Sequence, residues 1–291
     1  MSEQPDVVTS TFLRDWPLPD VEDAAGKRSR GTVAVIGGAA DTPGAVLLAG
    51  LAALRVGAGR LSIATADVNA SALAVAVPEA AVTALPTAGD GALGAAAVDR
   101  CGEVVDGADA VVLGPGLRSP EDARALVGGV LDAVGSGAVV VLDALGLTCG
   151  GMDGPRRDRL AARVVATPNR TEAGYLLDGD VPDDDAAAAR RLAEVIGGVV
   201  TLQSCIAAPG GRIWLDQSGN SGLGTSGSGD VLAGAIAGLA ARGAPPDQAA
   251  VWGVHLHAEA GERLAARIGR LGFLARELLD ELAPVLTQLE R

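Results

Sequence analysis

The sequence is poor in lysine, histidine, cysteine and aromatic residues, and the shortage of lysine by itself argues against two kinds of site. Of its 23 Lys and Arg residues, all but Lys27 are arginine. Lys27 precedes Arg28 and no glycine-rich loop precedes it, so the chain lacks the Gly-Lys-Ser/Thr triplet of a Walker-type phosphate loop. A pyridoxal Schiff base would have to use the same lysine, close to the N-terminus. We expect neither kind of site.

The few cysteines and histidines limit metal and nucleophile chemistry. Cys101, Cys149 and Cys205 lie far apart and have no CxxC spacing, which is typical of proteins from a reducing compartment. His255 and His257 are the two histidines, and a spacing of two places them on different faces of a helix. A zinc cluster or a Ser-His-Asp triad is therefore difficult to build, although either histidine could serve one.

The charge balance is strongly acidic. The formal net charge is −13 and aromatic residues make up 2% of the chain, so it offers neither a cationic field nor stacking platforms for nucleic acid. Residues 1–10 show no basic-then-apolar signal pattern. The most apolar stretch, residues 45–58, is too short to span a bilayer and contains Arg55. We expect a soluble cytoplasmic protein without nucleic-acid or membrane partners.

Short apolar runs alternate with helical segments, which indicates an α/β fold. Continuous Val-rich runs are typical of parallel strands buried on both faces. Ligands of such sheets bind at the carboxyl ends of the strands. We predict an N-terminal arm over residues 1–30 and a single domain over residues 31–291. The expected strands are 32–36, 60–65, 110–113, 139–142, 164–166 and 199–202, followed by a hairpin around 210–211; the expected helices are 44–56, one starting after Ser119, 229–241, 246–268 and 274–289.

The segment from Gly219 to Gly234 is a loop of small residues that runs into an apolar helix. Gly227, Ser228 and Gly229 would present backbone N–H groups to an anion at the helix N-terminus. Asp230 would then lie beside the anion, where a base for a hydroxyl that attacks phosphorus is needed. The alternative for Asp230 is a stabilising charge in the first turn of a helix.

Other polar or glycine-rich loops follow strands and have structural alternatives. Residues 37–45 and 114–116 allow close approach of a ligand, or are tight turns. Asp143 could face phosphate-bound Mg²⁺ or cap a turn. Asn169 and Glu172 could serve a hydrated metal or a phosphate, or form a capping box at a helix N-terminus.

Taken together, these segments resemble a known family. Gly227-Ser-Gly-Asp230 resembles the anion-hole and catalytic-Asp motif of ribokinase-like kinases. Further segments resemble one branch of that superfamily, the ADP/ATP-dependent NAD(P)H-hydrate dehydratases: residues 41–57, 113–117, 141–144, 167–172, 219–234 and 254–261. The resemblance runs in order from about residue 27 to 285. It implies a three-layer ribokinase-like fold with a central, mostly parallel sheet flanked by helices.

The resemblance also implies a reaction and its residues. A hydrated nicotinamide cofactor would be phosphorylated on its hydroxyl by ADP or ATP with Mg²⁺, and phosphate would then leave. Asp230 would be the base, and the protein would form a homo-oligomer, a tetramer in the resembled family. Substrate contacts are implied at Ala45, Gly116, Asn169 and Asp230, nucleotide or phosphate contacts at Gln203, Ser204, Asn220, Gly227, Ser228 and Gly229, and an Mg²⁺-phosphate region at Asn169 and Glu172.

Three positions depart from the family pattern. Asn169 stands where the family has histidine, Gln203 stands in place of a lysine, and Leu145 stands in place of a second Asp after Asp143. Glutamine and asparagine can form hydrogen bonds, but neither replaces the point charge of lysine on phosphate. Two alternatives therefore stay open: a small-molecule kinase of the same fold, supported by the Asn169-x-x-Glu172 spacing, and a catalytically silent relative.

Overall fold

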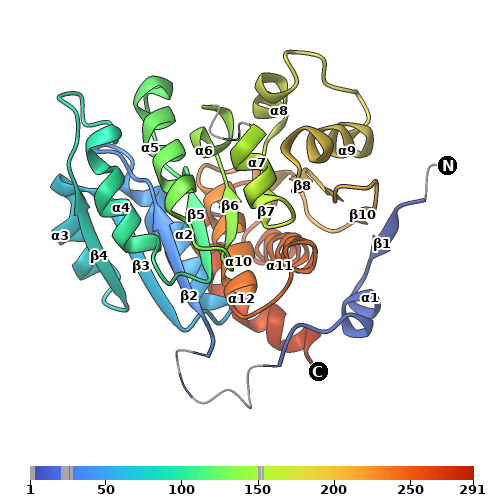
Figure 1. The fold of residues 1–291 in the computed structure, drawn as a ribbon. Coiled ribbons are helices and arrows are strands. Elements are labelled where there is room, and N and C mark those ends of the chain that lie inside the picture. Colours follow the sequence, from blue (N-terminus) through green and yellow to red (C-terminus); the bar gives the residue numbers. More distant parts are fainter. Residues whose placement is uncertain (1–3, 21–25, 27–28, 150–151, 153) are drawn as a thin grey trace.

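The computed structural model describes residues 4–20, 26, 29–149, 152 and 154–291, and this part of the chain forms one ten-stranded sheet between two layers of helices (Figure 1). The strand order is β1-β10-β9-β8-β7-β6-β5-β2-β3-β4. All neighbouring strands are parallel except where β9 pairs with β8 and with β10. The strands are β1 (Asp6–Val8), β2 (Thr32–Ile36), β3 (Arg60–Ala66), β4 (Ala80–Leu85), β5 (Ala110–Leu113), β6 (Val139–Leu142), β7 (Val164–Ala166), β8 (Val199–Leu202), β9 (Cys205–Ala207) and β10 (Ile213–Asp216).

Both faces of the sheet are buried, as the continuous apolar runs predict. On β2, Val33 and Val35 enter one core cluster, and Ala34 and Ile36 enter the other. Successive side chains of a strand point to opposite faces, so a strand between two helical layers has no polar side. The three-layer architecture expected from the resemblance is therefore confirmed.

The helices divide between the two faces. The first layer contains α2 (Pro43–Arg55), α3 (Asp67–Ala76), α10 (Ser228–Ala241), α11 (Pro246–Arg267) and α12 (Ala275–Leu289). The second contains α4 (Val98–Val105), α5 (Pro120–Ala133), α6 (Leu145–Thr148), α7 (Gly154–Leu160), α8 (Arg170–Leu176) and α9 (Asp185–Ile196). Helices α2 and α10 touch closely, since a Cβ atom built at Gly234 would lie 2.0 Å from the carbonyl oxygen of Ala49.

The predicted strands and helices are present within a few residues of their expected ends. Ser119 caps α5 by accepting a hydrogen bond from the Asp122 N–H at 3.4 Å, and Pro120 takes the first helical position. Residues 67–109 carried no prediction, and they contain α3, β4 and α4. Helix α3 is rich in alanine and has weak periodicity, whereas α4 is amphipathic, so a helical pattern was present in the sequence there.

Part of the N-terminal segment is attached to the body of the molecule. Strand β1 pairs in parallel with β10, and α1 (Ser10–Asp15) follows it. The carbonyl oxygen of Trp16 accepts hydrogen bonds from Trp252 Nε1 at 3.0 Å and Gln248 Nε2 at 3.1 Å. These contacts connect the segment to α11.

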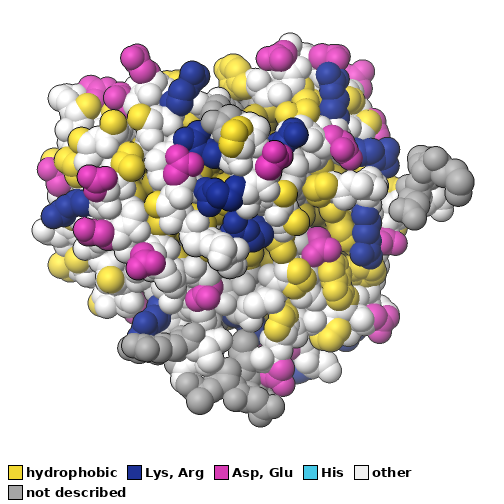
Figure 2. All heavy atoms as spheres, viewed as in Figure 1, with side chains coloured by type: hydrophobic (Ala, Val, Ile, Leu, Met, Phe, Trp, Pro, Cys, Tyr) yellow, Lys and Arg dark blue, Asp and Glu magenta, His cyan; other side chains and the backbone are white. Residues whose placement is uncertain are grey.

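Acidic and basic side chains are intermixed on the face drawn in Figure 2. Several arginines bind other groups of the protein as well as facing solvent. Arg156 forms an ion pair with Asp132 on α5 at 2.8 Å, and Arg163 donates a hydrogen bond to the Ala138 carbonyl at 2.7 Å. In the described part of the chain, no helix combines the length and apolar character needed to cross a membrane.

Candidate active site

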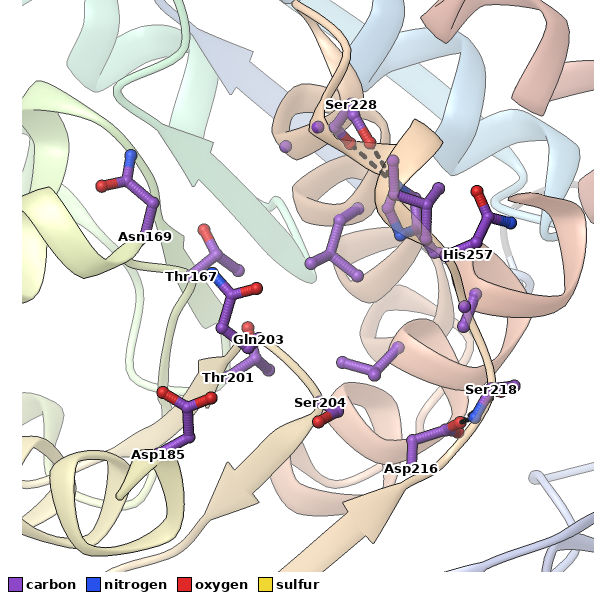
Figure 3. Close-up of a pocket in the computed structure, with 18 of the residues that line it drawn as sticks. Thr167, Asn169, Asp185, Thr201, Gln203, Ser204, Asp216, Ser218, Ser228 and His257 are labelled. Atoms are coloured by element: carbon purple, nitrogen blue, oxygen red, sulfur yellow. Dashed lines mark hydrogen bonds between the residues drawn. The ribbon is translucent and has the colours of Figure 1, made fainter. Parts of the chain in front are cut away.

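A cleft of about 900 Å³ lies at the carboxyl ends of β7 and β8, beside the N-terminus of α10 (Figure 3). Parallel strands and a helix N-terminus bring polar groups from distant parts of the sequence to this edge of the sheet. The predicted residues that line it are Asn169, Gln203, Ser204, Asn220, Ser228 and Gly229. Thr167, Asp185, Thr201, Asp216, Ser218 and His257 line it as well.

The anion end of the cleft is the start of α10. Gly227 precedes the helix with a φ of 88°, a left-handed conformation that glycine adopts without strain. Gly229 lines the cleft from the first turn, where N–H groups have no acceptor within the helix. Ser228 differs from the expectation of three exposed N–H groups, because its N–H donates to the Thr225 carbonyl at 3.2 Å. The Ser228 N–H is therefore not free to donate a hydrogen bond to an anion.

The Ser228 side chain instead meets a histidine of α11. His257 Nε2 lies 2.8 Å from Ser228 Oγ and 3.1 Å from the Ser228 carbonyl oxygen. Both side chains are buried. Burial lowers the pKa of His257 to about 4, so the imidazole is neutral near pH 7.

Asp230 lies in the first turn of α10 and directly follows Gly229, but it is not itself one of the described residues that line the cleft. A Cβ atom built at Gly227 would lie 3.8 Å from Asp230 Oδ2 and 2.6 Å from Leu48 Cδ1, which places the carboxylate and the α2 side chain around the same glycine. Burial raises the pKa of Asp230 to about 6. Asp230 is therefore a partly buried carboxylate that exchanges a proton closer to neutral pH than an ordinary aspartate does.

Ala45 and Gly116 lie outside the cleft but beside each other. A Cβ atom built at Gly116 would lie 3.0 Å from the Ala45 Cβ, and the Ala39 N–H donates to the Gly116 carbonyl at 2.9 Å. Ala45 and Leu48 are one helical turn apart on α2, so they share a face. This face leads from Gly116 to Leu48, and hence to Asp230.

Asn169 and Glu172 form the capping box that the sequence left as an alternative. Asn169 Oδ1 accepts from the Glu172 N–H, and Glu172 Oε2 accepts from the Asn169 N–H, each at 2.9 Å. Burial raises the pKa of Glu172. The pair therefore has a local structural role at the start of α8, while Asn169 also lines the cleft.

Asp143 follows β6 and is almost fully buried. Burial raises its pKa to about 7, the Thr167 hydroxyl lowers it, and the carboxylates of Asp230 and Glu172 raise it further. Asp230 and Glu172 are thus close enough to Asp143 to raise its pKa. Among the residues described by the structure, no group of three or more His, Cys, Asp or Glu side chains has the arrangement of a metal site.

Because Gln203 stands in place of the family's lysine, the described residues that line the cleft include no basic side chain. Gln203 occupies the tight turn between β8 and β9 with a φ of 53°. None of the described residues that line the cleft is Lys or Arg, whereas Asp185 and Asp216 are acidic. Asn220 accepts from the Gly222 N–H at 2.9 Å, and its buried Nδ2 has no hydrogen-bond partner in the described structure. Uncharged donors, rather than lysine, must hold a ligand here.

Two residue pairs that each include a cleft-lining residue were not predicted from the sequence. His255 Nδ1 lies 2.7 Å from Asp216 Oδ2, and the other carboxylate oxygen of Asp216 accepts from the Ser218 N–H at 2.8 Å. This pair and Ser228–His257 are separate, so the two histidines do face different elements. The position of Asp216 directly after an apolar run was an available signal, but the partnership of each histidine depends on the packing of α11.

A family model described as NAD(P)H-hydrate dehydratase matches residues 33–284. An ADP-dependent (S)-NAD(P)H-hydrate dehydratase from Xanthomonas campestris is 43% identical over 98% of this chain and 97% of its own length. A bifunctional NAD(P)H-hydrate repair enzyme from Moorella thermoacetica is 35% identical, and the chain spans 54% of its length.

Solved structures give the same fold. An ADP/ATP-dependent NAD(P)H-hydrate dehydratase from Bacillus subtilis, co-crystallised with ATP and Mg²⁺, has a TM-score of 0.80 at 28% identity, with 98% of this chain and 99% of that chain covered. A ribokinase-like superfamily protein from Enterococcus faecalis has a TM-score of 0.82 at 24% identity, covering 98% and 97% of the two chains.

Proposed function

The chain belongs to the NAD(P)H-hydrate dehydratase family, and we propose that it restores hydrated NADH and NADPH to the reduced dinucleotides at the expense of ADP or ATP. The relative from Xanthomonas campestris is named ADP-dependent, which favours ADP. The position of Asp230 supports the proposal, because it directly follows the cleft-lining Gly229 and its carboxylate lies beside Gly227 together with Leu48, on the α2 face that leads to Ala45 and Gly116.

The proposed reaction transfers a phosphoryl group from the nucleotide in the cleft to the hydrated ring on the side of Ala45 and Gly116. The nucleotide lies in the cleft with its terminal phosphate at the start of α10, and the hydrated ring lies on the side of Ala45 and Gly116. Asp230 takes the proton of the hydrate hydroxyl as its oxygen attacks phosphorus, which releases the shortened nucleotide. The phosphate ester then eliminates inorganic phosphate, and the ring loses a proton to restore the reduced nicotinamide.

Mg²⁺ fits the acidic character of the site. Mg²⁺ is usually bound by one or two carboxylates together with substrate phosphates and water. Glu172 and Asp143 are the carboxylates that would hold it, since burial raises both pKa values and the charges of Asp230 and Glu172 raise that of Asp143 further, a repulsion that a cation would relieve. When bound, the ion would neutralise phosphate charge, for which the described residues that line the cleft offer no basic side chain.

We also propose that the protein acts in the cytoplasm as a homo-oligomer, with residues 31–291 as one domain and residues 1–30 as an arm. The resemblance supports these assignments. The kinase alternative is not favoured by the Asn169-x-x-Glu172 spacing alone, because the capping box gives that spacing a structural explanation.

The decisive experiment follows recovery of the near-ultraviolet absorbance of the reduced nicotinamide ring. Purified protein is incubated with NADH hydrate, Mg²⁺, and ADP or ATP in parallel. Recovery that depends on the nucleotide, with one phosphate released per dinucleotide restored, is the expected result. A stable phosphorylated dinucleotide would instead indicate a kinase, and folded protein without either product would indicate a silent relative.

A further inference from the structure

The contact between His257 and Ser228 fixes where the protons of both side chains lie. A single ring nitrogen, Nε2, approaches both Ser228 oxygens, the hydroxyl at 2.8 Å and the carbonyl at 3.1 Å. A carbonyl oxygen only accepts hydrogen bonds, so a bare nitrogen lone pair directed at it would be repelled. Nε2 therefore carries the hydrogen and donates to both oxygens.

This assignment makes the Ser228 hydroxyl an acceptor toward His257. Its own hydrogen must then point elsewhere, and the structure records no second acceptor for it among the described residues. Ser228 is 4% exposed and lines the cleft at the first position of α10. Its backbone N–H is already bonded to the Thr225 carbonyl, so the hydroxyl is the donor that Ser228 has left.

We propose that His257 is a positioning residue that turns the Ser228 hydroxyl toward the phosphate of the bound nucleotide, as a side-chain donor added to the backbone donors of α10. The inference rests on the proposed function for the identity of the phosphate. It answers a need of this cleft, because uncharged donors replace the missing lysine. An imidazole with its hydrogen on Nε2 suits the task, since that nitrogen can only donate to the Ser228 hydroxyl and so leaves the hydroxyl hydrogen for another acceptor.

The tautomer of His257 tests the inference without any assay of activity. The chain has two histidines, so a ¹⁵N spectrum of the imidazole rings contains two sets of signals, and a His255→Gln variant assigns them. We expect His257 to be protonated at Nε2 and bare at Nδ1 at neutral pH. A ring protonated only at Nδ1 would overturn the proposal.

A double-mutant cycle tests the action of His257 through the hydroxyl. Ser228→Ala and His257→Leu should each lower kcat/KM for the nucleotide by about 10- to 100-fold, the range for a hydrogen bond to a charged group. The double variant should lose little more than Ser228→Ala alone, and His257→Gln, which keeps a donor, should recover part of the loss. Additive losses without recovery in the Gln variant would instead assign His257 a purely structural role.

The outcomes separate this inference from the proposed function. If the wild-type protein binds ADP but dehydrates no hydrate, the same cycle is measured by calorimetry with ADP, and coupled losses still support the positioning role. If the wild type is active and the losses are additive, the function stands and the inference fails. Thermal melts identify a variant that does not fold. If His257→Leu does not fold, the cycle is measured instead with Ser228→Ala, His257→Gln and the double variant of these two substitutions.

Discussion

Thr167 Oγ1 donates a hydrogen bond to Asp143 Oδ1 at 2.7 Å, and this bond joins the residues that follow two neighbouring parallel strands, β6 and β7. The bond stabilises the carboxylate, but burial and the nearby carboxylates outweigh it, so the pKa of Asp143 rises to about 7. The ionised form of Asp143 is therefore unfavourable in the folded protein, and a bound cation would make it less so.

We expect Asp143→Asn to stabilise the ligand-free protein at alkaline pH. With the folded pKa raised above the unfolded value, Asp143 destabilises the fold once it is ionised, fully above about pH 7 and not at all below about pH 4. Denaturant unfolding should show a gain on the order of 4 kcal/mol at pH 8 that disappears toward pH 4. A loss of stability at pH 8 would contradict this account.

Asp230→Asn should reduce turnover by about 10²- to 10⁴-fold, the usual loss for a general base. The substitution keeps the shape of the side chain and removes its proton affinity. Steady-state kinetics with NADH hydrate and ADP measure the loss. Asp247→Asn, in the first turn of α11, is the matched control and should retain activity. Near-normal turnover of Asp230→Asn would remove the role assigned to it.

The dependence of kcat/KM on pH should reflect the raised pKa of Asp230. The base acts only when it is ionised, so kcat/KM should fall as the pH drops through about 6, the pKa that burial gives this carboxyl. An ordinary aspartate would hold activity down to about pH 4. Measurement of kcat/KM between pH 4.5 and 8 distinguishes these two cases, provided that circular dichroism shows folded protein throughout. Constant activity down to pH 5 would exclude Asp230 as the titrating base.

Gln203→Lys should strengthen nucleotide binding. The position lines a cleft without a basic side chain, and a new cation near phosphate contributes about 1 kcal/mol in a high-dielectric setting, or about fivefold in Kd. Calorimetry with ADP should show the gain at low salt and its decline at high salt. Gln203→Met, similar in length but uncharged, should show no gain. Equal affinities for the Lys variant and the wild type would place the phosphates away from this loop.

Ala45→Trp should separate the two binding regions. The indole would cover the α2 face between Gly116 and Leu48, outside the nucleotide cleft. We expect KM for the hydrate to rise about tenfold or more, because misplacement of a substrate by even 1 Å is costly. The Kd for ADP should stay unchanged. A parallel rise in both constants would show that Ala45 belongs to the nucleotide region.

The sequence by itself determined the architecture and most of the elements. Continuous valine runs, such as residues 139–142, leave no polar face, and this pattern suffices for parallel strands between helical layers. The motif around Gly227 and Asp230 likewise marked a loop that opens a helix, because glycine adopts positive φ without strain. These features are local, so the residues alone carry them.

Only the tertiary structure decided which residues meet. Packing of α11 against α10 and β10 pairs His257 with Ser228 and His255 with Asp216, and the spacing of two along the helix does not identify either partner. The bond from the Ser228 N–H to the Thr225 carbonyl is by contrast local, three residues back in the chain, and it leaves the hydroxyl as the donor of Ser228. The raised pKa values of Asp143 and Asp230 also depend on burial and on neighbours distant in the sequence, because the electrostatic cost of a charge is set by everything that surrounds it.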